Sequence, residues 1–179
     1  MAEEKKEKWL NYLALTTVVL AVCATLSTFK GGNFSTLAVL SQNQASDQWS
    51  YYQAKSIKGY VYEIQKEKLE LELKVMGQKA AKGIAEEYEK KLDAYAKKIK
   101  KYEDEKAKIE KEAKELERVR AEAQRHSRAF GVAVIFLQIA ILLSSISALM
   151  KKKILWLLGS VVGVLGIVYF MNGFFLFIK

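Results

Sequence analysis

Residues 154–178 read ILWLLGSVVGVLGIVYFMNGFFLFI, and this run of 25 residues contains no charged side chain. Two further uncharged runs have similar lengths, WLNYLALTTVVLAVCATLSTF over 9–29 and FGVAVIFLQIAILLSSISALM over 130–150. About 20 apolar residues in a helix cover the ~30 Å hydrocarbon core of a bilayer. The three runs therefore predict transmembrane helices at 9–29, 130–150 and 154–178, preceded by a short tail over 1–8. The lipid bilayer is then the first predicted partner.

The charged residues are concentrated between the first two runs. Residues 43–129 hold 21 basic and 17 acidic side chains, whereas the rest of the 179-residue chain holds 8 and 3. A nearly balanced mixture binds polyanions poorly, so we expect no nucleic-acid partner despite the net charge of +9. The chain has no proline, which argues against an all-β or loop-rich fold. The composition predicts an all-α membrane protein.

Residues 84–128 carry a coiled-coil pattern. Apolar or small residues recur at alternating steps of four and three, interrupted by Lys106 and Arg120, and most other positions hold strong helix formers. The members of this row are Tyr88, Leu92, Tyr95, Ile99, Tyr102, Ile109, Ala113, Leu116 and Ala123. A single solvated helix held by Glu–Lys pairs is the alternative.

Residues 54–75 repeat the pattern with two rows of apolar side chains. The first row is Ala54, Ile57, Val61, Ile64, Leu71 and Val75, with Lys68 among them, and the second is Tyr62, Leu69, Leu73 and Met76. The second row widens the apolar face of the predicted helix.

Glycines mark the expected ends of these helices. Gly77 and Gly83 predict a turn between them, and the sequence Lys-Gly-Gly-Asn at 30–33 predicts a break after the first membrane helix. The resulting arms, about 34–76 and 84–128, are each roughly 65 Å long. Equal arms predict a long antiparallel coiled-coil hairpin over 30–129, outside the membrane. We expect it to place Ala54 near Leu116 and Val75 near Tyr88.

Residues 41–58, SQNQASDQWSYYQAKSIK, differ from their surroundings because they are rich in amide, hydroxyl and aromatic side chains. On a helix these side chains form stripes that suit hydrogen bonding across an interface. The predicted interaction face consists of Asn43, Gln44, Asp47, Trp49, Tyr52 and Lys55. We expect this face to join copies of the chain in a homo-oligomer, or to contact an unidentified protein partner.

The segment NQASDQWSYYQAKSIK, between one N-terminal and two C-terminal membrane helices, resembles an uncharacterised bacterial membrane-protein family, a domain of unknown function. The three-helix layout covers the whole chain, and the close motif covers about 18 residues of it. The resemblance implies a bacterial inner-membrane protein. It implies no activity, cofactor or catalytic residue.

The membrane runs predict close helix packing rather than chemistry. Gly159, Gly163 and Gly166 form a small-residue surface, within the chain or between subunits. No charged residue or histidine lies in any run, which disfavours a proton-coupled carrier. One cysteine, Cys23, and one histidine, His126, provide no metal cluster and no catalytic triad. We therefore predict no catalytic residue, no metal site, no cofactor and no enzymatic activity.

Lysines indicate the orientation. Lys5, Lys6 and Lys8 precede the first helix, and 151–153 link the second and third. The positive-inside rule places the N-terminus and this link in the cytoplasm and 30–129 in the periplasm, although four arginines over 118–128 oppose this. A signal peptide is the alternative for 9–29, but this run is longer than a usual h-region.

Two functions fit these features. The first is a membrane-anchored, self-associating coiled-coil scaffold or partner-binding platform. The second is a subunit of an oligomeric pore or of a transport-associated membrane complex. A hydrated opening through the spans of the oligomer distinguishes the second from the first.

Overall fold

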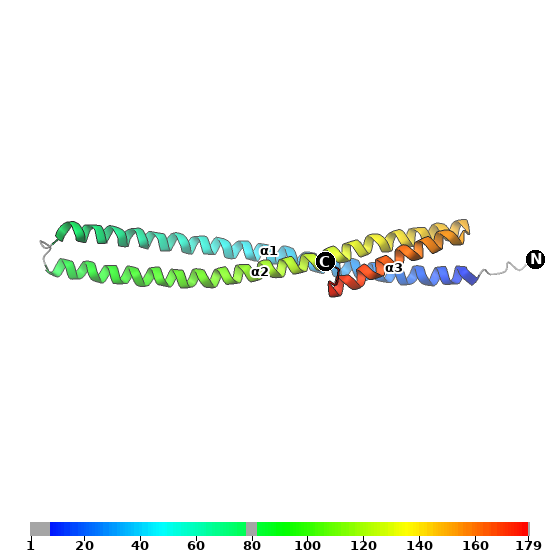
Figure 1. Ribbon diagram of the computed structural model, residues 1–179, viewed down its shortest axis with the longest axis horizontal. Coiled ribbons are helices and arrows are strands. Elements are labelled where there is room, and N and C mark those ends of the chain that lie inside the picture. The colour runs from blue at the N-terminus through cyan, green and yellow to red at the C-terminus, as the bar shows by residue number, and fades with distance from the viewer. Residues whose placement is uncertain (1–7, 78–81, 179) are drawn as a thin grey trace, which may run out of the picture. The chain divides into compact units, whose positions relative to one another are not determined.

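The computed structural model describes residues 8–77 and 82–178. Within these ranges the secondary structure consists of the helices α1 (Lys8–Met76), α2 (Lys82–Met150) and α3 (Lys153–Phe175) (Figure 1). No strand occurs among the described residues, so this part of the chain is all-helical, as predicted. Most of the predicted turn and nearly all of the N-terminal tail lie outside the described residues.

The chain divides into two compact units. The first comprises Met1–Leu40 and Val119–Lys179, and we call it the three-helix unit because it contains parts of α1 and α2 and all of α3. The second comprises Ser41–Arg118 and contains the remaining parts of α1 and α2, so we call it the two-helix unit. Each of the three helices contains a segment that is long and apolar enough to cross a membrane, by length and composition.

The expected break at 30–33 does not occur, because α1 is continuous through this segment. Gly31 lies where α1 approaches α2 closely: a Cβ atom added to it would lie 3.1 Å from Cβ of Phe130. The Ser127 hydroxyl donates a hydrogen bond to the Gly31 carbonyl at 3.1 Å. The glycine therefore serves close helix packing, and its cost of about 1 kcal/mol in helix propensity does not end the helix.

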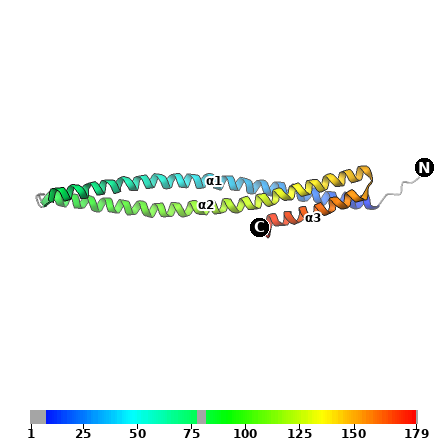
Figure 2. The same ribbon diagram turned by 45° about the horizontal axis from the view of Figure 1, so that its top comes forward.

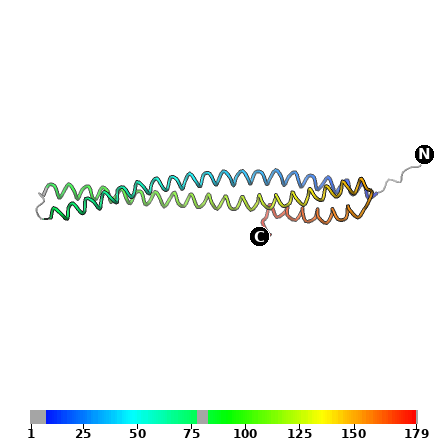
Figure 3. The backbone as a smooth tube through the Cα atoms, turned by 90° about the horizontal axis from the view of Figure 1, so that it is seen from above, coloured from blue at the N-terminus to red at the C-terminus, as the bar shows by residue number. Residues whose placement is uncertain are grey.

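Within the two-helix unit, α1 and α2 lie side by side and run in opposite directions (Figures 2 and 3). Glu72 contacts Tyr88, and Lys55 contacts Glu105. The expected neighbourhood of Ala54 and Leu116 is wrong, since Lys55 pairs about ten positions earlier on α2. The expectation was based on arms beginning at the supposed break, whereas α1 continues through 30–33 and pairs with α2 through contacts such as Glu72 with Tyr88.

The three-helix unit has a core of small and aliphatic side chains. Its buried members are Leu20 and Ala24 from α1 and Ala133, Leu137 and Ala140 from α2. Side chains of α3, including Val162 and Ile167, pack against this cluster. Small residues at the contacts allow the helix backbones to approach closely, which is the packing expected between helices without a strong hydrophobic drive.

The last helix ends earlier than the apolar run predicted. α3 stops at Phe175, and Leu176 adopts a left-handed conformation with φ of 49°. The Leu176 amide donates to the Asn172 carbonyl at 2.8 Å, and the Ile178 amide donates to the Asn172 side-chain oxygen at 2.7 Å. The buried asparagine thus accepts from the chain beyond the helix, a local interaction that an apolar-length criterion does not detect.

Candidate functional site

Between Trp49 and Tyr62, the side of α1 that faces α2 in the two-helix unit carries polar and aromatic side chains. The Tyr62 ring lies 5.6 Å from that of Tyr95 and 5.9 Å from that of Tyr102. Lys98 donates a hydrogen bond of 3.1 Å to the Tyr62 hydroxyl, which raises the pKa of the lysine. Its ammonium also lies 4.6 Å from the centre of the Tyr62 ring, within cation–π range. Aromatic stacking and cation–π contacts therefore form the centre of this seam.

Lys55 provides the ion pair of the seam. Its ammonium lies 2.7 Å from the Glu105 carboxylate, and both side chains are mostly covered, at 15% and 31% exposure. The hydrogen bond between them raises the pKa of Lys55 and lowers the pKa of Glu105. The same ammonium lies 5.1 Å from the Tyr51 ring and 5.5 Å from the Tyr102 ring. One lysine thus connects the two helices through a carboxylate and an aromatic ring.

Two further contacts hold the helices together near this ion pair. The Trp49 indole donates a hydrogen bond of 2.9 Å to the Glu117 carboxylate, and its ring packs edge-on against Tyr52 at 5.5 Å. Lys106, one of the two residues that interrupt the apolar row of α2, lies 5.5 Å from the Tyr52 ring and 5.6 Å from the Tyr60 ring. The interruption is therefore matched by aromatic rings on α1.

The structure divides the predicted interaction face between two sides of α1. Trp49, Tyr52 and Lys55 contact α2 of the same chain. Asn43, Gln44 and Asp47 are exposed. We therefore find that the second half of this face is used within the chain, and that only the first half remains available to another molecule.

The two apolar rows of 54–75 also lie on different sides of α1. The side chains of Tyr62, Leu69, Leu73 and Met76 are half-buried, whereas the first row, from Ala54 to Val75, is exposed. Sequence reasoning treated the rows as one broad apolar face. The contacts of Tyr62 with Tyr95 and Tyr102 on α2 show which row lies inside, and the sequence of α1 alone does not reveal them.

The three predicted membrane-packing glycines are buried in the three-helix unit. Added Cβ atoms would lie 3.1 Å from Cβ of Leu143 at Gly159, 2.9 Å from Cδ2 of Leu20 at Gly163, and 2.8 Å from Cγ of Leu137 at Gly166. All of these neighbours belong to α1 or α2 of the same chain, so the glycine surface of α3 is occupied within the subunit.

A histidine that sequence reasoning left without a role ties α3 to α2. Nδ1 of His126 lies 2.8 Å from the Gly173 carbonyl oxygen, and because a carbonyl only accepts, this nitrogen carries the proton. The imidazole stacks on Phe34 with ring centres 4.5 Å apart. The interaction satisfies a carbonyl in the last turn of α3, which no later amide of the helix reaches.

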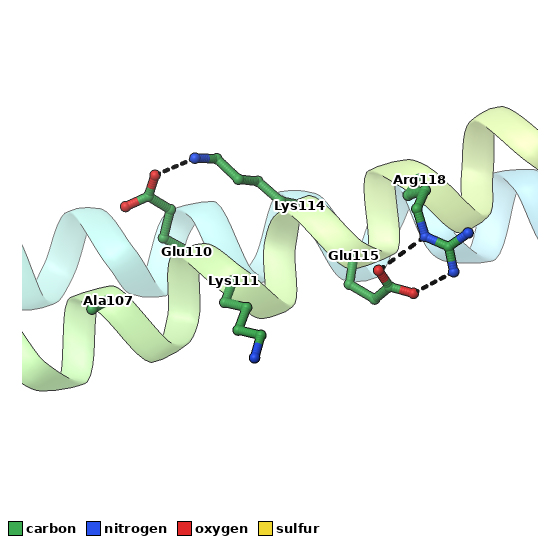
Figure 4. A pocket seen from close by; sticks show the side chains of 6 residues that line it. All are labelled: Ala107, Glu110, Lys111, Lys114, Glu115 and Arg118. Atoms are coloured by element: carbon green, nitrogen blue, oxygen red, sulfur yellow. Dashed lines mark hydrogen bonds and ion pairs between the residues drawn. The ribbon is translucent and has the colours of Figure 1, made fainter.

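The charged surface of α2 holds a shallow, open depression lined by Ala107, Glu110, Lys111, Lys114, Glu115 and Arg118 (Figure 4). Lys114 pairs with Glu110, and Arg118 pairs with Glu115, each within one helical turn. Such exposed pairs stabilise a helix modestly and present no converging chemistry. Among the described residues, no group of three or more metal-ligating side chains lies close enough together to hold an ion.

Comparison with protein families matches residues 9–176 to the family described as "Domain of unknown function (DUF4337)". The match covers α2, α3 and all of α1 except Lys8. No curated protein and no solved structure matches the chain.

Proposed function

The chain belongs to the DUF4337 family of unknown function, and from this premise we propose that it is a membrane-anchored, self-associating coiled-coil scaffold or partner-binding platform without catalytic activity. In this proposal the three-helix unit is the anchor and the two-helix unit is an antiparallel coiled-coil hairpin that carries the binding surface. The observation that carries the proposal is the exposed apolar row of α1, on a helix that α2 already holds on its other side.

The exposure of apolar side chains on the three-helix unit supports the proposal that this unit is a membrane anchor. Only 17–28% of the most apolar window of each helix is buried within the structure. Residues such as Leu15, Val18 and Val161 are about 60% exposed. Water disfavours this exposure, whereas lipid tails do not. We therefore propose that the three-helix unit lies in a bilayer, which the family resemblance implies is the bacterial inner membrane.

The hairpin is supported by contacts that set register. A coiled-coil seam of leucines tolerates sliding by a heptad, but the ion pair of Lys55 and Glu105 and the hydrogen bond of Trp49 and Glu117 each fit only one alignment. A rigid hairpin with one register presents its outer side in a fixed geometry. This is the property that a scaffold needs.

Particle mass of the full chain in detergent and in lipid nanodiscs, over a wide concentration range, tests self-association. The scaffold predicts oligomers whose reconstituted vesicles do not pass ions. A monomer at every concentration contradicts self-association. Ion flux, together with a hydrated opening through the spans, indicates the pore instead.

Sidedness is tested separately. We propose that the N-terminus and the 151–153 link are cytoplasmic and that the hairpin is periplasmic, on the lysine distribution. In a Cys23→Ser chain, Gly83→Cys should react with an impermeant thiol reagent only from the periplasmic face, and Lys152→Cys only from the cytoplasmic face. The reverse pattern overturns the orientation and leaves the scaffold proposal intact.

A further inference from the structure

The side of α1 that points away from α2 carries a regular apolar row, which we call the outer row. It consists of Ala54, Ile57, Val61, Ile64, Lys68, Leu71 and Val75, at alternating steps of three and four. Its five large aliphatic side chains are between 51% and 87% exposed. The lysine is the one charged member.

The spacing of the outer row determines what can cover it. A repeat of 3.5 residues keeps the apolar side chains on one stripe, and a second helix with the same repeat fills the holes between them. Contiguous exposed apolar surface of this kind marks an interaction site. In the heptad, Val61, Lys68 and Val75 take the first core position, and Ile64 and Leu71 take the second.

A second copy of the chain supplies a matching helix in a compatible direction. α1 itself contains a segment able to cross the membrane, so two copies anchored in one bilayer present their α1 helices in parallel. The outer face of α2 does not match, because charged residues such as Lys97, Lys100, Lys101 and Asp104 line it. The two-fold arrangement therefore pairs outer row with outer row.

Lys68 and the carboxylates near it form one polar layer in the parallel, in-register alignment. Lys68 lies 3.9 Å from Glu72 on its own helix. In register, Glu67 of one copy faces Glu72 of the other across the core layer that holds both lysines, so four carboxylates surround two ammonium groups. An antiparallel alignment about the centre of the row would instead place Lys68 against Val61. A single lysine at such a position sets register at some cost in stability.

The row ends where its chemistry changes. The next two heptad positions toward the N-terminus hold Ser50 and Asp47, and Asp47 is exposed. Two copies in register would bring like charges together at Asp47, so the apolar contact stops at Ala54.

We propose that the outer row of α1, Ala54 to Val75, is the homodimer interface of this protein, formed by a parallel, in-register pair of α1 helices with Lys68 as its register-setting layer. This rests on the proposed scaffold function, which it deepens by naming the surface and the partner.

Cross-linking of the full chain in membranes tests the interface. In a Cys23→Ser background, Val61→Cys and Ile64→Cys should each give a covalent dimer with a short bis-maleimide. The matched control is Glu70→Cys, which lies on the same helix away from the outer row and should give little dimer. Two variants in nanodiscs test how strongly the interface holds the dimer together. The double variant Ile64→Glu, Leu71→Glu should raise the dissociation constant of the dimer at least about a hundredfold. Lys68→Ile should lower this constant by about tenfold or more.

The outcomes separate the two proposals. A wild-type chain that remains monomeric and gives no cross-link contradicts both self-association and the outer row. An oligomeric wild type in which Glu70→Cys cross-links as well as Val61→Cys, and in which the glutamate variant assembles normally, overturns the outer row alone. Cross-links only to another protein replace the second copy with a foreign helix. Circular dichroism of the glutamate variant checks folding, and the single cysteine variants decide the question if that variant unfolds.

Discussion

Replacing Gly166 with alanine tests how closely α3 packs on α2. A Cβ atom at this position would lie 2.8 Å from Cγ and 2.9 Å from Cδ2 of Leu137, and 3.0 Å from its backbone nitrogen. Leu137 is fully buried, so its side chain has no open space to enter. The backbone nitrogen cannot move by rotating a side chain. The two helices must therefore separate by several tenths of an ångström, and neighbouring contacts weaken with them.

The expected change in the free energy of unfolding is the difference between two opposing effects. Inserting a methyl group into a packed core costs typically 1–3 kcal/mol, whereas replacing a mid-helix glycine with alanine recovers about 0.5–1 kcal/mol. Gly166→Ala should therefore lower the free energy of unfolding by about 1–2 kcal/mol. Gly163→Ala should cost less, because the nearest atoms there are the flexible ends of Leu20. Gly131→Ala should be neutral or slightly stabilising, since nothing lies within 4 Å of its added Cβ.

Reversible unfolding of the full chain in bicelles, followed by tryptophan fluorescence, measures these differences. Trp9 and Trp156 lie in the three-helix unit with ring centres 6.3 Å apart, so their emission reports on its packing. The loss of unfolding free energy on substitution by alanine should decrease in the order Gly166, Gly163, Gly131. Equal stabilities for the Gly166→Ala and Gly131→Ala variants would refute the close contact between α2 and α3.

Two further predictions concern polar contacts. His126→Phe keeps an aromatic ring against Phe34 but removes the donor to the Gly173 carbonyl, so thermal unfolding should show a loss of about 1 kcal/mol; an unchanged midpoint would contradict the hydrogen bond. The hydrogen bond with Lys55 lowers the pKa of Glu105 in the folded state. The pair therefore stabilises the fold at pH values above the unfolded carboxyl pKa of about 4.3. This stabilisation is lost as the pH falls through the lower pKa of the folded state. The melting-temperature difference between wild type and Glu105→Gln should therefore be steady from about pH 6 to 9 and shrink below about pH 4, and a difference that does not change with pH would argue against the pair.

The helices themselves were predictable because their signals are long and redundant. The apolar runs 9–29, 130–150 and 154–178 are so long that a single atypical residue does not change the prediction of a helix. Each run overlaps a helix that is long and apolar enough to span a membrane. At the start of the predicted turn, Gly77 has a φ of 52°, a left-handed conformation that favours glycine. These features depend on the composition of a segment and on local backbone conformation, both of which can be read from the sequence.

The details that depended on one contact were not predictable. Gly31 and Gly32 are typical of a break, but the approach of Phe130 to Gly31 makes the first a packing residue, and sequence alone does not show which helix lies opposite. The two rows of α1 present the same difficulty. Both are apolar with the same period, and contacts such as those of Tyr62 with Tyr95 and Tyr102 show which row faces α2.

The two rows of α1 have different roles in the proposed scaffold. The contacts within the chain are directional: an ion pair at Lys55, a hydrogen bond at Trp49 and stacked rings at Tyr62 each depend on one geometry. The outer row is mostly aliphatic, and its attraction depends on area rather than on angle. If the aliphatic row were the internal seam, the hairpin would hold together with poorly defined register and would expose its tyrosines and lysines. In the proposed scaffold, contacts within the chain align the two helices, and the apolar area of the outer row remains for the proposed association, in which Lys68 sets the register.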